Sequence, residues 1–159
     1  MKKNSILSLI LVIMVACFPS CLESGLDDLP TYSETEVKAI NFEYRWAIPE
    51  NVYDPWAGEK MQVKTLTTKA NFADGVIECE ITVPAASGTF TEEVRSKVSL
   101  DNLIAYVTIS PGASIAPNGS SPMLGKAGDF SKADMSYKVT AADGKNKQDW
   151  KLVIKSFIK

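Results

Sequence analysis

The sequence predicts an all-β domain built as a two-sheet sandwich. Apolar and polar residues alternate with a period of two in six or seven short segments after residue 36. Proline and glycine separate these segments, no strand–helix–strand alternation occurs, and a single short stretch has helical character. This pattern is typical of two sheets that pack their apolar faces together and expose polar outer faces.

The first strand begins at Val37, where Ile40, Phe42, Tyr44 and Trp46 fall on one face. The intervening residues are polar, so this face is expected to point into the core. The same alternation predicts five later strands through Met61, Val63 and Thr65; Ile77, Cys79, Ile81 and Val83; Leu103, Ala105, Val107 and Ile109; Met135, Tyr137, Val139 and Ala141; and Trp150, Leu152 and Ile154.

Shorter features connect these strands. Thr89-Phe90-Thr91-Glu92 matches a capping box, which predicts one or two helical turns between residues 89 and 98. A short extended piece at residues 113–117 is followed by a loop at 118–128. Asp143-Gly144 is a turn that tolerates positive φ before the last strand.

The N-terminus has the form of an export signal. Lys2 and Lys3 precede the apolar run Ile6 to Ala16, which is about half the ~20 residues that a membrane-spanning helix needs. Cysteines follow at positions 17 and 21, where a lipoprotein signal peptidase would cut. The run therefore predicts a removable signal rather than a transmembrane anchor.

Cys21 is the favoured site of lipidation. Ser20-Cys21 resembles the loose lipobox of Bacteroidetes lipoproteins, and a polar acidic tether follows it. Two alternatives remain: lipidation at Cys17, and a plain signal peptide that is cut near Ala16. The predicted organisation is a signal peptide at 1–20, a flexible acidic tether at 21–35 and a sandwich domain at 36–159.

Composition excludes several classes of function. Removing residues 1–20 takes two of the 17 basic residues and none of the 19 acidic ones, which leaves a net charge of −4. A mildly acidic chain without a basic cluster is a poor nucleic-acid binder. The chain has no histidine, so the commonest general base and the imidazole metal ligands are absent. Aspartates are scattered without the spacing of a calcium loop. We expect no enzyme activity, no cofactor and no metal.

One segment is the candidate ligand site. Tyr53 and Trp56 lie among prolines in a predicted loop, with Asp54 and Asn51 beside them. Sugars are recognised when an aromatic ring packs on the apolar face of a pyranose while amides and carboxylates bond its hydroxyls. The alternative is that both rings cap the end of the sandwich. Tyr44 and Trp46 are in phase with the strand and are assigned to the core.

The strand at residues 77–83 carries a pair of carboxylates. Glu78 and Glu80 lie about 6.6 Å apart along one strand face, a separation close to that of hydrolytic carboxylate pairs. Glutamates on the outer face of a strand are far more often solvated charges, and we interpret them so. Cys79 between them faces inward and is expected to be a small buried hydrophobe.

The C-terminal half resembles a known family. Residues 109–117, Asp129-Phe130-Ser131, residues 137–144 and Trp150 are similar to a recurrent immunoglobulin-like module of Bacteroidetes lipoproteins, classed as a domain of unknown function. Proteins of this kind are often encoded beside glycan-uptake systems. The resemblance implies an immunoglobulin-like sandwich of about seven strands with one short helical turn, and it transfers no catalytic residue.

Signal, fold and resemblance together predict a function. We expect a non-enzymatic accessory lipoprotein, anchored by its N-terminal lipid in the outer membrane and exposed at the cell surface. It would bind a glycan or a component of a glycan-uptake complex. The alternative is a structural or assembly module of the cell envelope that has no small-molecule ligand.

Overall fold

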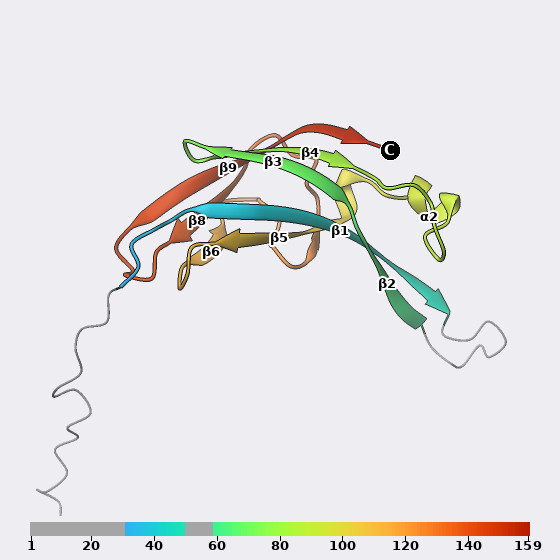
Figure 1. Cartoon of the computed structure of the whole chain (residues 1–159), viewed down its shortest axis with the longest axis horizontal. Coiled ribbons are helices and arrows are strands. Elements are labelled where there is room, and N and C mark those ends of the chain that lie inside the picture. Colours follow the sequence, from blue (N-terminus) through green and yellow to red (C-terminus); the bar gives the residue numbers. More distant parts are fainter. Residues whose placement is uncertain (1–30, 50–58) are drawn as a thin grey trace, which may run out of the picture. The chain divides into compact units, whose positions relative to one another are not determined.

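The computed structural model describes residues 31–49 and 59–159, which form an all-β sandwich (Figure 1). One sheet has the strand order β2-β1-β5-β7, and the other has the order β3-β4-β9-β8-β6. Most neighbours are antiparallel, but β4 and β9 pair in parallel. The elements are β1 (Val37–Pro49), β2 (Glu59–Thr65), β3 (Thr67–Ala73), β4 (Val76–Thr82), helix α2 (Glu92–Ser96), the 3-10 turn η1 (Leu100–Asn102), β5 (Leu103–Ile109), β6 (Ser114–Pro117), β7 (Ala127–Gly128), β8 (Met135–Thr140) and β9 (Lys147–Ile158).

The predicted all-β sandwich with one short helical turn is confirmed. Within the described ranges there are nine strands rather than about seven, because β3 was not predicted and β7 lies in a segment expected to be a loop. The predicted signal peptide at 1–20 and most of the tether at 21–35 lie outside the described residues. None of the helices in the described part of the chain has the length and apolar character that a membrane crossing requires.

Side chains from both sheets fill the core. Phe42 on β1 is fully buried and meets Phe130 edge to face, with ring centroids 5.4 Å apart. The inward residues predicted on β4, β5 and β8 are buried as expected, apart from Val107 and Ile109, which are half-buried. Burial of these side chains is the main stabilising contribution in a domain without a disulfide among its described residues.

The end of β1 carries an aromatic cluster. Tyr44 is buried and Trp46 is half-buried, and their rings are stacked with centroids 6.1 Å apart. Trp46 also contacts Phe90, whose ring centroid is 5.4 Å away. Trp150 is buried as well, and its indole N–H donates to the Thr35 carbonyl over 2.8 Å. The core role predicted for Tyr44 is confirmed, and Trp46 packs against the core as a half-buried residue.

The chain changes sheets between β2 and β3. Leu66, the single residue between them, is buried, and its N–H donates to the Phe42 carbonyl over 2.9 Å. The expectation that Met61 and Val63 face the core is wrong: they are 57% and 49% exposed. Their register explains this, because they lie opposite Ala47 and Arg45, on the outer face of β1.

Helix α2 begins two residues later than the capping box predicts. Thr91, rather than Thr89, is the N-cap, and its side chain accepts a hydrogen bond from the Val94 N–H over 3.3 Å. Phe90 is buried and forms an isolated β-bridge with Ser87, so the chain is still extended at the position where the predicted helix would start. Thr89 instead donates to the Gln62 side chain on β2.

Positive φ occurs at several turns, and two of these turns connect paired antiparallel strands. Asp74 and Gly75 have φ of 50° and 74°, which suits the tight hairpin between β3 and β4. A Cβ on Gly75 would lie 2.9 Å from the Asp149 carbonyl, so glycine also permits the close approach of β9. At the predicted Asp143-Gly144 turn, Gly144 has φ of 67°. The Asp143 carboxylate there accepts from the Lys145 and Asn146 N–H groups.

Candidate functional site

The residues that the sequence marked as a ligand site are Asn51, Tyr53, Asp54 and Trp56. They lie outside the described residues, as do Cys17 and Cys21. The segment 50–58 joins the paired ends of β1 and β2, where Pro49 lies opposite Glu59. The structure therefore leaves the predicted loop site as a prediction, and the described surface supplies a different candidate.

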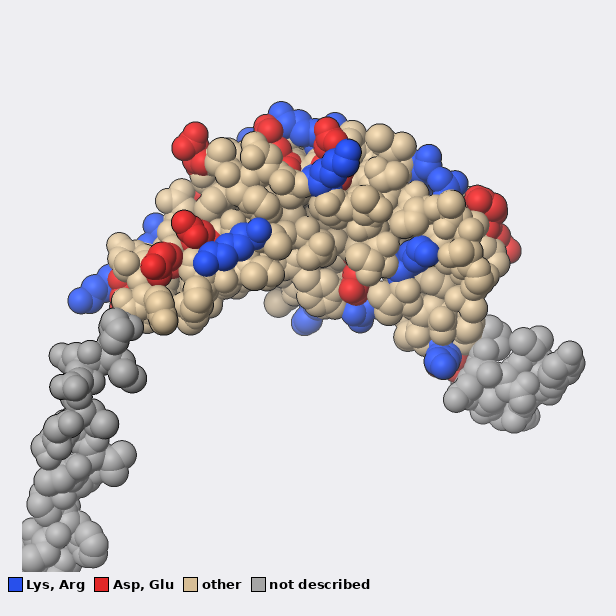
Figure 2. All heavy atoms as spheres, in the orientation of Figure 1, with Lys and Arg blue, Asp and Glu red and all other residues tan. Residues whose placement is uncertain are grey.

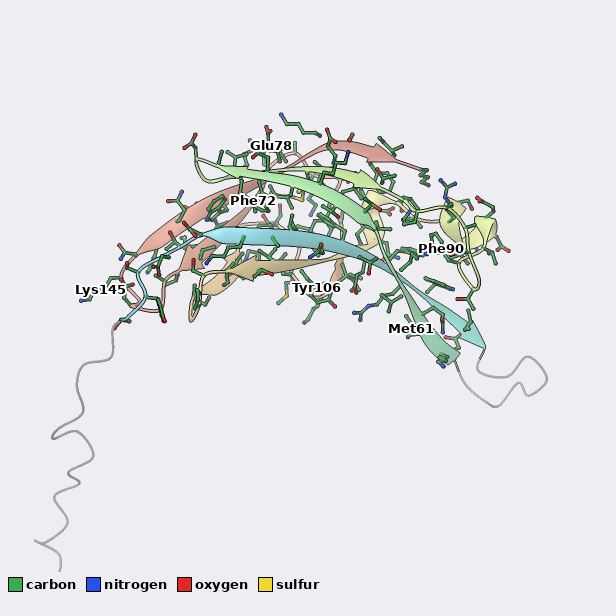
Figure 3. The ribbon with its side chains drawn as sticks, in the orientation of Figure 1. Met61, Phe72, Glu78, Phe90, Tyr106 and Lys145 are labelled. Carbon is green, nitrogen blue, oxygen red and sulfur yellow. The ribbon has the colours of Figure 1, made fainter. Side chains whose placement is uncertain are left out.

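That candidate is the outer face of the four-stranded sheet. Tyr106 on β5 lies opposite Asn41 on β1, and residues two apart on a strand share a face. Asn41, Glu43 and Arg45 therefore project from β1 on the same side as Tyr106. Figure 3 shows Tyr106 and Met61 on one side of the ribbon and Glu78 on the other. Tyr106 is 38% exposed, so part of its ring is accessible.

An arginine fixes the polar end of this ring. Arg45 Nη2 donates to the Tyr106 hydroxyl over 2.6 Å and to Glu43 Oε2 over 3.2 Å. Both contacts involve one nitrogen, whereas a guanidinium carries five N–H donors and a phenol hydroxyl can still donate its own hydrogen. The trio therefore holds the ring in place, and the Arg45 side chain, which is 39% exposed, keeps further N–H donors beside a carboxylate that can accept.

The chain after β6 flanks the ring on its other side. The Gly125 N–H donates to the Ala105 carbonyl over 2.8 Å, which ties this segment to β5. A Cβ built on Gly125 would lie 3.9 Å from the Tyr106 ring. The backbone at Gly125 thus borders the ring without covering it, and the exposed Lys126 follows directly.

Apolar side chains continue the same face toward the end of the sheet. Val63 lies opposite Arg45, and Met61 lies opposite Ala47. Three of the exposed large hydrophobic residues of the described chain thus lie on one sheet face. We call this surface the Tyr106–Met61 stripe; it consists of Tyr106, Asn41, Glu43, Arg45, Ala47, Val63 and Met61.

The outer face of the five-stranded sheet has a different character. Charged side chains gather along the β3, β4 and β9 side in Figure 2. A shallow pocket of about 220 Å³ there is lined by Lys69, Asn71, Glu78, Glu80 and Lys155, together with Ala70. Glu78 forms an ion pair with Lys155 over 2.7 Å, and Glu80 is exposed. This arrangement fits the interpretation of both glutamates as surface charges.

Cys79 is inaccessible to substrate. It is fully buried, and burial raises the pKa of its thiol from 9.0 to about 12. A thiol that stays protonated at neutral pH is a poor nucleophile, so the expectation of a small buried hydrophobe is confirmed. Within residues 31–49 and 59–159, no three carboxylates or thiols lie close enough together to hold a metal ion.

The sequence carried one signal for Tyr106 that the prediction did not use. Leu103, Ala105, Val107 and Ile109 alternate as inward residues, which places Tyr106 on the outward phase. An aromatic residue on a solvent-facing phase is a candidate contact residue. Its pairing with Arg45, 61 positions earlier, depends on the contact between β1 and β5 and has no signal in the sequence.

The fold and this surface define an all-β sandwich domain with an outer sheet face that carries an accessible aromatic ring. The chain belongs to the DUF5018-related family, which matches residues 37–153. This match confirms that the chain belongs to a domain family, as the resemblance predicted. Among curated proteins, none matches this chain.

The solved structures that are similar to the chain include two from Bacteroides species. A protein from Bacteroides fragilis, described as a "putative secreted protein", is 32% identical with a TM-score of 0.71. The match covers 82% of this chain and 100% of that chain. A "putative glycoside hydrolase" from Bacteroides thetaiotaomicron is 21% identical with a TM-score of 0.44, over 82% of this chain and 27% of that one. The second likeness is too low to carry a conclusion.

Proposed function

We propose that this protein is a non-enzymatic lipoprotein of the outer membrane, exposed at the cell surface, that binds a glycan as an accessory to glycan uptake. The signal-like N-terminus with Cys21 supports export and anchoring. Similarity to a Bacteroides protein described as secreted supports a place outside the cytoplasm. The absence of histidine from the whole sequence supports binding rather than catalysis.

One observation carries the binding role: the accessible Tyr106 ring, whose hydroxyl is held by Arg45 over 2.6 Å. An immobilised ring can pack on the apolar face of a sugar at a low cost in side-chain entropy. Asn41, Glu43 and the remaining donors of Arg45 surround it with groups that bond hydroxyls. The same stacking and hydrogen bonding were expected of the segment around Tyr53 and Trp56. Tyr106 and its neighbours offer them at positions that the structure describes.

A structural or assembly role is the second candidate. The observation that favours it is the exposure of Met61 and Val63 on the edge strand β2. Apolar side chains at an exposed sheet edge are typical of surfaces that meet another protein. In that role the face would contact a component of the envelope and need no sugar.

Replacing Tyr106 with alanine tests the binding role. We expect the affinity for glycans retained by the parent protein to fall about tenfold, which corresponds to about 1.4 kcal/mol. Affinity electrophoresis in gels that contain single polysaccharides measures this directly. Tyr32→Ala is the matched control, because Tyr32 is 54% exposed and lies before β1, away from the stripe. Equal retardation of both variants and the parent would contradict the assignment of Tyr106.

Lipidation is tested by metabolic labelling with a fatty-acid analogue. We expect the label in the parent protein and in Cys17→Ser, and its loss in Cys21→Ser, because only a cysteine at the cleavage site receives acyl chains. One acyl chain holds a protein only marginally while several hold it stably, so Cys21→Ser should leave the membrane fraction. Loss of the label in Cys17→Ser instead would assign the lipid anchor to Cys17. An unmodified N-terminus near Ala16 would show a plain signal peptide.

A further inference from the structure

The charges along the Tyr106–Met61 stripe compensate one another. Arg45 is paired with Glu43 over 3.2 Å, and the remaining stripe residues carry no charge. At the β2 end of the stripe, Glu59 precedes Met61 by two positions and lies on the same strand face. The stripe together with Glu59 therefore carries no net positive charge.

We infer that the stripe selects an uncharged polysaccharide chain over an acidic one. This inference rests on the proposed function, because it names the class of glycan that the same face would take. A uronate or sulfate could reach Arg45 only beside Glu43, where two anions would repel each other. A neutral sugar can instead accept a hydrogen bond from Arg45 and donate one to Glu43 at the same time. The charges of Arg45 and Glu43 then still balance each other.

The length of the stripe indicates a chain rather than a single sugar. Tyr106 is in register with Asn41, and Met61 is in register with Ala47, six residues further along β1. At about 3.4 Å per residue this spans roughly 20 Å, which exceeds one pyranose ring. The stripe also crosses three adjacent strands, so several rings of a polysaccharide would contact it in sequence.

The test compares uncharged and acidic polysaccharides on the full chain. The probes are β-glucan, α-glucan and galactomannan on one side, and polygalacturonate and chondroitin sulfate on the other. We expect retention by at least one uncharged polymer, with an affinity that changes less than about twofold as salt is raised, because a compensated site attracts no net charge. We expect the acidic polymers to bind at least about tenfold more weakly.

Glu43→Gln is the diagnostic variant. It removes the compensating carboxylate and keeps a group that can bond hydroxyls, so affinity for polygalacturonate should rise about tenfold and become salt-dependent. Binding of the uncharged polymer should weaken rather than rise, because a neutral amide accepts from sugar hydroxyls less strongly than a carboxylate. Glu80→Gln, an exposed glutamate on the opposite sheet, is the matched control and should change neither. Thermal unfolding of each variant verifies that it is folded.

The outcomes separate this inference from the proposed function. Tighter binding of acidic polymers by the parent, lost at high salt, would overturn the inference and leave glycan binding in place. An unchanged preference in Glu43→Gln would overturn it as well. Retention of no polysaccharide would overturn both. With Met61→Ala we expect weaker binding of a hexasaccharide but not of a disaccharide of the retained polymer, and equal loss for both lengths would contradict an extended chain.

Discussion

Phe42→Ala is expected to lower the free energy of unfolding by about 3–5 kcal/mol. Phe42 is fully buried between the sheets, and its ring meets Phe130 edge to face at 5.4 Å. Removing the ring takes away buried apolar surface and leaves a cavity that the surrounding strands can fill only in part. Since domains of this size are stable by roughly 5–15 kcal/mol, the loss is a large fraction of the total.

Urea denaturation followed by tryptophan fluorescence measures this effect. Met123→Ala is the control, because Met123 is 55% exposed and its truncation should change stability by less than about 0.5 kcal/mol. Phe42→Leu should lie between the two, since leucine keeps part of the volume. A loss below about 1 kcal/mol in Phe42→Ala would contradict the packing of the two sheets around this ring.

The second large effect is a loss of stability in alkaline solution. Burial raises the pKa of the Cys79 thiol from 9.0 to about 12 and that of the Tyr137 phenol from 10.0 to about 12. Between these values the unfolded chain releases a proton that the folded chain retains, so each group favours unfolding as the pH rises. The free energy of unfolding should fall by about 1.4 kcal/mol per pH unit for each group.

The two pKa shifts define the pH range over which stability is lost. The contribution of Cys79 is complete below pH 9 and is lost up to about pH 12, and that of Tyr137 is lost from pH 10 to about pH 12. Urea midpoints at intervals from pH 8 to pH 11 measure the slope. Cys79→Ala removes one titrating group, so its stability should depend less steeply on pH than that of the parent between pH 9 and pH 11.

Tyr137→Phe gives the second comparison. It removes the phenol and also the hydrogen bond that Tyr137 donates to the Pro122 carbonyl over 2.9 Å. We therefore expect a loss of about 1 kcal/mol at pH 7, combined with a flatter profile above pH 10. If both variants lose stability with pH as steeply as the parent, the groups are not buried in the way the structure describes.

Sequence reasoning succeeded where one strand face is fully buried. On β4, Ile77, Cys79 and Ile81 alternate with polar residues, and all three are inaccessible. A strand between a core and solvent must show period two, because successive side chains point to opposite faces. The inward residues of β8 and the first half of β1 were predictable for the same reason.

The edge strand β3 escaped prediction, and the outward face of the edge strand β2 was not foreseen, for the converse reason. β3 runs through Thr67-Thr68-Lys69-Ala70-Asn71-Phe72-Ala73, and none of its side chains is fully buried. No residue of β2 is buried: one face is exposed throughout and the other is half-buried at two positions, so its apolar residues need not mark the core. Where neither face of a strand is buried, apolar residues are not restricted to one face. The alternation then does not indicate which face points into the core.

The sequence by itself determined the lack of histidine and the sandwich class, because these depend on composition and on local alternation. The export signal stays a prediction from the sequence. It placed the candidate site in the aromatic segment around Tyr53 and Trp56, where aromatic residues are close in sequence. Only the tertiary structure brought Tyr106 to Arg45 and turned Met61 and Val63 outward. Strand pairing between distant segments decides such contacts, and pairing partners are set by the packing of the whole core rather than by any local pattern.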